Sequence, residues 1–454
     1  MAYQPAPPVP PARRKRRRRL WPVLLLVLVL ALGGTAAFAT VGAQAAVPAP
    51  AVLLIFTPSV ELKHAAGAYA AATTGALLEQ GDWVRTGAKG RAAIELPDGS
   101  VTKLDVNTEL QLTTAELGSD GRLARVQVDQ TAGRTLTKVQ HLLAGSTYNV
   151  HGHAASVEVR GTQFEITIAA AGTALVQLFE GKLHVSGTNA ADLGAGQQTA
   201  VAPNGTVGAP APLQEDPNDI FTLERRAAGA QTGNLGSVQV DENSAGPGQA
   251  VQARPYGHPG GDLSAVLAYP GSLMRLDLSG PNGFHASQAV APPIKITVPN
   301  APPGVYTATA TALDVPAAGE NLVLSLGNNL ACKPGTVEQG GARRYALAAA
   351  DVAAQLQKAG ISGATVSVQG TSPTGVTVSA DGSLKGARLS FAAVALAAPP
   401  NLVVVPTRVS AAGFPVAATR LAGIVGVNLR SIPVGFQLDR VYTCPGVMVL
   451  EGRD

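Results

Sequence analysis

Two histidines one residue apart, His151 and His153, come closest to the spacing of a metal site. On a β-strand both imidazoles would project from one face, and His141 or His184 would be the candidates for a third ligand. No cysteine or acid stands at ligand spacing beside them, and the intervening Gly152 indicates a loop. We therefore interpret them as solvated loop histidines, and we expect neither a metal nor a cofactor.

The sequence also lacks the short motifs that carry common enzyme chemistry. It contains no phosphate-binding glycine loop ending in Lys-Ser/Thr, no nucleophile elbow and no carboxylates paired by a motif. Its acids stand mostly in turns, such as Asp98, Asp120 and Asp381, where a carboxylate hydrogen-bonds the backbone. We predict that the protein has no catalytic residues and is not an enzyme.

Cysteine chemistry is limited to Cys332 and Cys444. Two cysteines are too few for a disulfide scaffold, and their separation does not fit a zinc site. Cys332 precedes the C-terminal segment and Cys444 lies in its last predicted hairpin, so a disulfide would join the two ends of that segment. Oxidising surroundings would favour this bond, and the chain-entropy model gives it a stabilising effect of about 4 to 5 kcal/mol on the folded state. Two separate thiols are the alternative.

A basic run and then an apolar run stand near the N-terminus. The basic residues are Arg13, Arg14, Lys15, Arg16, Arg17, Arg18 and Arg19, and no charge follows until Glu61. A helix needs about 20 apolar residues to cross a bilayer, and positive charge stays on the cytoplasmic side. We therefore expect a cytoplasmic tail (1–19), a transmembrane signal anchor (20–43) and a chain that is otherwise extracytoplasmic, with a single pass through the plasma membrane.

A cleaved signal peptide is the alternative, with small residues at 43–45 as the cleavage site. Either interpretation exports the chain. The other 27 of the 34 basic residues are balanced by 30 acidic residues, so the high pI does not indicate a nucleic-acid-binding surface. The expected partners are the membrane, an envelope lipid or polymer, and an unidentified protein, with no nucleic acid.

Composition favours many short strands. The 454 residues include 51 glycines and 33 prolines but only 4% aromatic residues, which suits turns better than long helices. We predict a mainly β protein with these segments: a spacer (44–51), an all-β domain (52–202), a linker (203–236) with a short helix near 219–226, an immunoglobulin-like β-sandwich (237–330) and an α+β module (337–454).

Local patterns support these segments. Asp98-Gly99, Asp120-Gly121 and Glu180-Gly181 predict hairpin turns, and the alternation over 92–96 predicts one buried and one solvated strand face. Helical spacing of Leu347, Val352, Leu356 and Ile361 opens the last module, with Gly360 ending the helix. Strands over 364–369, 375–380 and 402–409, a second helix over 416–429 and a closing hairpin are expected to follow.

The all-β domain resembles the FecR domain. The resemblance rests on five blocks in order: Gly-Asp-Trp-Val-Arg-Thr-Gly at 81–87, then 90–100, 159–164, 178–185 and 194–197. The motif residues are Gly81, Asp82, Asp98, Gly99, Arg160, Gly161, Thr162, Glu180 and Gly181. Turns and tight backbone positions account for most of them. A ligand surface that includes Arg160 and Thr162 is the alternative.

The FecR resemblance implies the exported part of an anti-sigma signalling protein, whose cytoplasmic domain would hold a sigma factor. This chain departs from that arrangement because only about 20 basic, Pro-rich residues precede the apolar run, too few for a folded domain. Direct control of a sigma factor is therefore not expected.

The C-terminal module is similar to the LmeA-like family of exported phospholipid-binding proteins at 348–356, 402–409 and 432–441. This resemblance implies an apolar groove for acyl chains, and the candidates to line it are Leu421, Ile424, Val425 and Leu429. The alternative is that these four side chains fill an ordinary core.

Together these patterns predict a membrane-anchored extracytoplasmic protein that binds or senses an envelope ligand or partner. One alternative is a transmembrane signalling component that acts through the short tail. Another is a structural or adhesive envelope protein.

Overall fold

The computed structural model describes most of the chain after residue 46. The described ranges are 47–49, 51–96, 98–117, 123–140, 145–152, 154–159, 161–231, 237–329, 335–358, 360–372, 375–384, 386–411, 414–415 and 432–454. The basic run and the apolar run lie outside them. Within these ranges no helix is both long and apolar enough to cross a bilayer. The membrane anchor stays a prediction.

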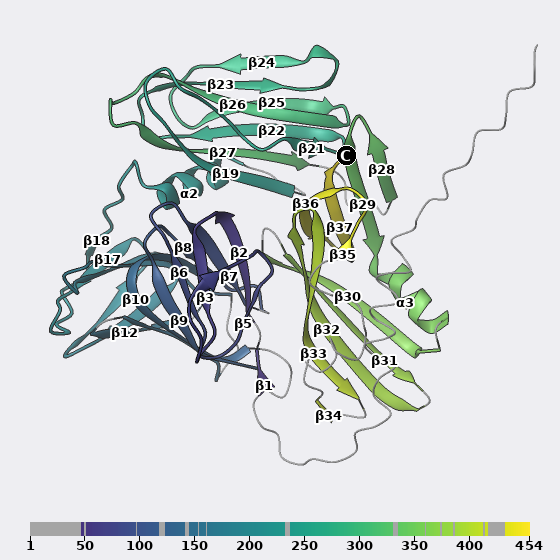
Figure 1. Cartoon of the computed structure of the whole chain (residues 1–454), viewed down its shortest axis with the longest axis horizontal. Coiled ribbons are helices and arrows are strands. Elements are labelled where there is room, and N and C mark those ends of the chain that lie inside the picture. The colour runs from purple at the N-terminus through teal and green to yellow at the C-terminus, as the bar shows by residue number, and fades with distance from the viewer. Residues whose placement is uncertain are drawn as a thin grey trace, which may run out of the picture.

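Three β-rich modules lie in a triangle, as Figure 1 shows, and the mainly β fold class is confirmed. We call residues 47–212 the first module, 237–329 the sandwich and 335–454 the C-terminal module. Helix α2 (Ile220–Ala230) lies between the first module and the sandwich.

The first module is a closed barrel of short antiparallel strands with one parallel pair, β10 with β11. Its strands are β1 (Val47–Pro48), β2 (Ala51–Thr57), β3 (Val60–Lys63), β4 (Ala70–Ala71), β5 (Leu77–Leu78), β6 (Trp83–Thr86), β7 (Arg91–Glu95), β8 (Val101–Leu104), β9 (Glu109–Leu117), β10 (Leu123–Lys138), β11 (Thr147–Gly152), β12 (Ala155–Val159), β13 (Gln163–Ile168), β14 (Ala174–Glu180), β15 (Lys182–Ser186), β16 (Ala190–Gly194), β17 (Gln197–Val201) and β18 (Ala211–Pro212). The barrel wall consists of two sheets, and strand β10 belongs to both. Its residues 123–132 pair with β9 and β11, and its residues 133–138 pair with β8 and β13.

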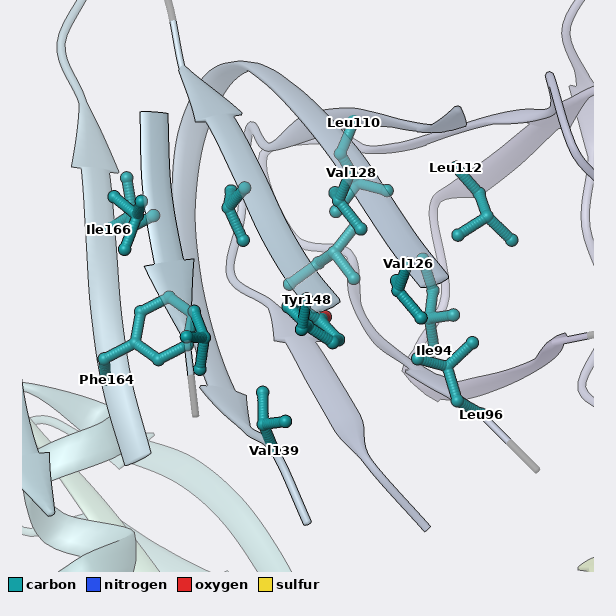
Figure 2. Packing of buried hydrophobic residues seen from close by; sticks show 14 of the residues in the cluster. Ile94, Leu96, Leu110, Leu112, Val126, Val128, Val139, Tyr148, Phe164 and Ile166 are labelled. Carbon is teal, nitrogen blue, oxygen red and sulfur yellow. The ribbon is translucent and has the colours of Figure 1, made fainter. Parts of the chain in front are cut away.

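Strand alternation explains the core of this module. On β11, Tyr148 and Val150 are buried while Asn149 and His151 point outward. Figure 2 shows Tyr148 and Phe164 packed among aliphatic side chains, whose burial supplies most of the stabilisation. A small cavity in this core is lined by Ile94, Leu96, Thr102, Leu110, Leu112, Val128 and Tyr148. The Tyr148 hydroxyl lies 2.9 Å from the Thr102 hydroxyl, so these two groups satisfy each other.

The segment interpreted as a linker contains the predicted helix, which packs between two modules. Asp219 caps α2, because its side chain accepts a hydrogen bond from the Thr222 amide at 2.8 Å. The helix buries Ile220, Phe221 and Leu223 against both neighbours. Its apolar face therefore makes it part of a module junction and not an exposed spacer.

The sandwich has two facing antiparallel sheets around one core. Strands β19 (Ser237–Ala245), β27 (Glu320–Asn329), β22 (Gly261–Ala268) and β25 (Ile294–Ala301) form one sheet; β20 (Ala250–Gln252), β21 (Tyr256–His258), β26 (Gly304–Asp314), β23 (Leu273–Ser279) and β24 (His285–Gln288) form the other, with a 3-10 turn η2 (Pro281–Gly283). The Tyr306 hydroxyl donates to the Pro302 carbonyl at 3.1 Å. Such a tyrosine corner is typical of immunoglobulin-like sandwiches.

The C-terminal module combines one described helix with two sheets. One sheet contains β28 (Gly335–Gln339), β29 (Ala342–Ala348), β37 (Val447–Arg453) and β36 (Gln437–Cys444); the other contains β30 (Ser362–Ser372), β31 (Gly375–Leu384), β32 (Ala387–Ala398), β33 (Asn401–Ala411), β34 (Phe414–Pro415) and β35 (Ile432–Pro433). Helix α3 (Ala349–Lys358) begins after Leu347, which lies on β29, and Gly360 follows its end with a positive φ, as predicted.

The predicted second helix of this module, 416–429, lies outside the described residues, and so do the groove candidates Leu421, Ile424, Val425 and Leu429. The lipid-binding groove therefore stays a prediction.

The C-terminal module also covers part of the first module. Val394, Leu396 and Val403 of β32 and β33 pack against Val52, Leu54 and Ala93. The prediction of one solvated face on the strand over 92–96 is therefore wrong, because Ala93 and Glu95 are each 1% exposed. The cover comes from residues 300 positions away in the sequence, which no local pattern can reveal.

Candidate binding site

Strand β6 carries the Gly-Asp-Trp-Val-Arg-Thr-Gly block, and strand alternation divides its side chains into two groups. Asp82, Val84 and Thr86 are buried, whereas Trp83 is half-buried and Arg85 is exposed. The inward residues hold the fold, and the outward residues face solvent. The block therefore contains both a structural part and a surface that a ligand could contact.

Asp82 fixes the loop that precedes this strand. Its carboxylate accepts hydrogen bonds from the amides of Ala65 (3.1 Å) and Glu79 (2.9 Å), and it lies 2.9 Å from Nδ1 of His64. The side chain of Asp82 is nearly inaccessible, and Gly81 beside it has a φ of +94°. Both residues serve local structure.

Asp98 and Gly99 form the predicted turn between β7 and β8, and Gly99 has a φ of +85°. The Asp98 carboxylate accepts from the amide and the hydroxyl of Ser100, each at 2.9 Å. Burial raises the pKa of Asp98 above its ordinary value, although the Ser100 hydrogen bonds oppose the shift. The turn is thus held by its own side chains.

The motif residues near 161 and 180 meet in space. Gly181 has a φ of +88°, and a Cβ there would lie 2.6 Å from Cγ2 of Thr162 and 2.8 Å from the carbonyl oxygen of Gly161. Only glycine fits this contact. Thr162 is 2% exposed, which suits packing better than ligand contact, and Arg160 lies outside the described residues.

The prediction of a hairpin at Glu180-Gly181 is wrong. Strand β14 pairs with β13 and β17, whereas β15 pairs with β12 and β16. Gly181 is therefore the corner at which the chain passes from one sheet of the barrel to the other.

We define the aromatic face as Glu61, Lys63, Tyr69, Trp83, Arg85 and Glu109, which lie on and beside β3, β6 and β9. Cross-strand pairing places Lys63 opposite Trp83 and Arg85 between Glu61 and Glu109. Nζ of Lys63 lies 4.6 Å from the Trp83 ring centre and 5.1 Å from that of Tyr69, and the Arg85 guanidinium lies 3.9 Å from the Tyr69 ring.

Hydrogen bonds hold the charged groups of this face in place. Nε of Arg85 donates to Glu61 at 2.6 Å, and the Tyr69 hydroxyl donates to Glu109 at 2.8 Å. Burial and the Glu109 hydrogen bond raise the pKa of Tyr69, so the phenol stays a donor at physiological pH. Two rings, two cations and two carboxylates on one face are suited to non-covalent recognition.

Sequence reasoning did not single out this face. Trp83 and Arg85 stand inside the quoted motif block, and period-two alternation beside the buried Asp82 and Val84 was the signal that could have found them. Lys63 and Tyr69 become neighbours only through strand pairing.

The histidines gather no metal site within the described residues. The interpretation of His151 as a loop residue is wrong, because it lies on β11, where it is exposed. His153 and His141 lie outside the described residues. The exposed His184 on β15 pairs with Asp192 at 2.7 Å, away from a third ligand.

Cys444 at the end of β36 is buried and disulfide-bonded. The chain's other cysteine, Cys332, lies outside the described residues, so the Cys332–Cys444 bridge itself stays a prediction.

Comparison with known proteins gives a partial match. No curated protein matches the chain. Two crystal structures of a candidate anti-sigma factor from Parabacteroides distasonis ATCC 8503, at 1.65 and 2.50 Å resolution, are 20% identical, with TM-scores of 0.27 and 0.26. The match covers 32% of this chain and 64% of that protein, less than two thirds of its length. Residues 82–184 match the family model described as FecR protein, and the chain therefore carries a FecR domain in its first module.

Proposed function

We propose that this protein is a membrane-anchored extracytoplasmic sensor that binds an envelope ligand or partner through the aromatic face of its first module. The observation that carries the proposal is the FecR domain, whose motif block contributes Trp83 and Arg85 to that face. The basic and apolar runs near the N-terminus support export and anchoring.

The aromatic face is favoured over the other motif residues because of its exposure. Asp82, Gly99, Thr162 and Gly181 serve turns and buried contacts. Interfaces are enriched in Trp, Tyr and Arg, and their rings and guanidinium groups carry much of the binding energy. Trp83, Tyr69 and Arg85 supply these three side chains on a single face.

Transmembrane signalling is the second candidate. FecR domains are associated with signal transduction, and the similar Parabacteroides protein is described as a candidate anti-sigma factor. In this chain such a signal would reach a cytoplasmic partner through residues 1–19. A structural or adhesive role would instead require binding to an envelope polymer, and a lipid-holding role would require the groove proposed for the C-terminal module.

The test is co-purification of the full-length protein from its native membranes after cross-linking. Wild type is compared with Trp83→Ala and Arg85→Ala, and with His184→Ala as a control on an exposed strand of the same module. We expect a partner that wild type and the control retain and that both face variants lose. Equal recovery by all four proteins would refute the assignment of the face, and recovery of the chain in the cytosolic fraction would refute export.

A further inference from the structure

The aromatic face continues into a row of polar side chains that crosses β3, β6, β9, β10 and β11. Cross-strand pairing places Gln111 of β9 between Trp83 of β6 and Asp129 of β10. Asp129 in turn lies opposite His151 of β11. We call Lys63, Trp83, Gln111, Asp129 and His151 the polar row. Neighbouring strands lie about 4.8 Å apart, so the row extends over about 15 Å from Trp83 to His151.

Strand alternation turns the polar row toward solvent. The residues on either side of Gln111, Leu110 and Leu112, are buried in the core. Gln111 and Asp129 are partly exposed, and His151 is exposed. A ligand can therefore reach the row along its length.

The row lies on the sheet of the barrel wall that does not pack against the other modules through an apolar contact. Among the described residues, the buried clusters that join the first module to its neighbours lie on the other sheet, where Val52 and Leu54 contact the C-terminal module and Leu136 contacts α2. Strands β9 and β10 lie on the side of the first module away from the C-terminal module (Figure 1). Space for a large ligand therefore exists on this side.

The adjacent row of outward side chains is satisfied internally. The Arg85 guanidinium donates to Glu61. Glu109 accepts from the Tyr69 hydroxyl with one oxygen and, at 2.8 Å, from the Thr131 hydroxyl with the other. These groups hold one another in place and leave little hydrogen-bonding capacity for a ligand.

The polar row, by contrast, keeps hydrogen-bonding capacity to spare. Gln111 donates to the Gly81 carbonyl at 2.9 Å, and its amide oxygen is left to accept. Asp129 is contacted at 3.4 Å by Gln127. In the part of the chain that the structure describes, the His151 ring has no hydrogen-bond partner. Amide, carboxylate and imidazole groups together can both donate to and accept from hydroxyl groups.

The composition of the row argues against several classes of ligand. Nucleic acids and anionic lipids bind to clusters of lysine and arginine, whereas the row contains one cation, Lys63, and one acid, Asp129. Protein interfaces usually have an apolar core, and the row has no apolar side chain beyond Trp83. Its chemistry fits an uncharged chain that is rich in hydroxyl groups.

A polysaccharide meets these conditions. The C–H face of a sugar packs against an aromatic ring, here Trp83 at one end of the row, and the sugar hydroxyls bind to amides and carboxylates. The polar groups recur about every 4.8 Å, once for each strand, which suits a chain of repeated units laid across the strands.

We propose that the polar row binds an uncharged stretch of an envelope polysaccharide, which lies across β6, β9, β10 and β11 with one sugar against Trp83. This inference rests on the proposed function of the aromatic face and names the chemical class of its ligand.

The experiment is cosedimentation of the purified full-length protein, in detergent, with increasing amounts of the envelope fraction of its own cells. Separate portions of this envelope are treated with periodate, which oxidises sugar diols, with protease, or with organic solvent, which extracts lipid. We expect binding that periodate abolishes and that protease and solvent leave intact. Because the ligand is uncharged, raising NaCl from about 0.1 M to about 0.5 M should change the apparent Kd by less than about twofold.

Substitutions in the row test where the chain lies. His151→Ala should weaken binding about three- to tenfold, as expected for the loss of a hydrogen bond, and Trp83→Ala should weaken it about tenfold or more. His184→Ala changes another exposed histidine of the same sheet, outside the row, and should bind like wild type. Thermal unfolding of each variant should match that of wild type, because none of the three side chains is buried.

Loss of binding after protease but not after periodate would overturn this proposal and leave the aromatic face as the site of a protein partner. A drop in affinity of more than about tenfold at high salt would show a charged ligand and would also overturn it. Equal binding by His151→Ala and wild type would remove the row from the site. No binding to untreated envelope would refute the proposed function itself.

Discussion

Two polar junctions hold the three modules together, and they differ in how their charges are balanced. At the junction between the first module, α2 and β19, carboxyl groups outnumber cations: the cations are Arg91, Lys103 and Arg134, and the carboxyl groups are Asp105, Glu165, Asp219, Glu224 and Glu242. At the junction between the sandwich and the C-terminal module, one buried carboxylate, Glu451, lies 3.2 Å from Arg440 and 3.6 Å from Arg344. Cations therefore outnumber the carboxylate at the second junction, whereas carboxyl groups outnumber cations at the first.

The second junction is also the more tightly built. Arg440 donates to the Gly257 carbonyl at 2.8 Å and lies 4.0 Å from the Tyr256 ring, both in the sandwich. Glu451 accepts from Tyr442 and, at 3.3 Å, from Asn328 of the sandwich. Hydrogen bonds and a cation–ring contact therefore join the sandwich to the C-terminal module.

Of the substitutions that test this comparison, Glu451→Gln should lower the free energy of unfolding most. It leaves two buried arginines without their carboxylate, and breaking such a group typically costs about 3 to 5 kcal/mol. Equilibrium denaturation should show this loss. Glu338→Gln, which changes an exposed acid on β28 of the same sheet, is the control and should be nearly silent. A loss equal to the control's would mean that packing, and not charge, holds the second junction.

Gly257→Ala tests the same junction sterically. A Cβ at position 257 would lie 2.1 Å from the carbonyl oxygen of Gly452 on β37, so the sandwich and the C-terminal module must separate locally. Overpacking of this kind costs about 1 to 3 kcal/mol. Gly229→Ala in α2 meets no atom within 4 Å and should instead stabilise by about 0.5 to 1 kcal/mol. Measuring the free energy of unfolding of both variants tests whether the second junction is crowded at Gly257 while α2 is not at Gly229. Similar values for the two variants would contradict this difference.

Glu242→Gln tests the charge excess at the first junction through stability. Because the folded pKa of Glu242, about 8, lies above its ordinary 4.5, the favourable contribution of the protonated carboxyl is complete below pH 4.5 and is lost as pH rises to 8. The variant lacks this loss. Relative to wild type, it should gain about 1 to 2 kcal/mol between pH 7 and pH 9. Denaturation at both pH values measures the gain, and a constant difference would show that Glu242 does not titrate in this range.

Local chemistry made part of this structure predictable. The turn at Asp98-Gly99, the short helix after Asp219 and the stop at Gly360 depend on residues a few positions apart, and the sequence contains those residues. The hairpin predicted at Glu180-Gly181 was wrong, because an acidic residue followed by glycine also suits a corner at which the chain passes from one sheet to another. Strand β32 was not predicted because its run of alanines, including Ala392, Ala393 and Ala395, lacks a strand signature.

The junctions and the grouping of side chains into the aromatic face could not be predicted, because they depend on partners far apart in the sequence. Glu242 meets Arg91 from another module, and Lys63 meets Trp83 only through the register of β3 and β6. A charge pattern along the chain does not show which acids will share a shielded space. Single-sequence reasoning therefore found the motif that identifies the domain and assigned its turn residues, but it missed the outward side chains Trp83 and Arg85.

The smallest effect on stability should come from a substitution in the aromatic face. Such a substitution can therefore separate binding from folding within one motif. Arg85→Ala removes an exposed ion pair, which contributes little in water, and we expect no measurable change in unfolding. Asp82→Ala, three positions earlier, removes a buried carboxylate that accepts from the amides of Ala65 and Glu79, and it should destabilise clearly. Denaturation and the co-purification assay on the same two variants test this: Arg85→Ala should lose the partner while folding normally. Loss of stability in Arg85→Ala would instead make the aromatic face part of the scaffold, because a side chain that folding needs cannot be assigned to recognition alone.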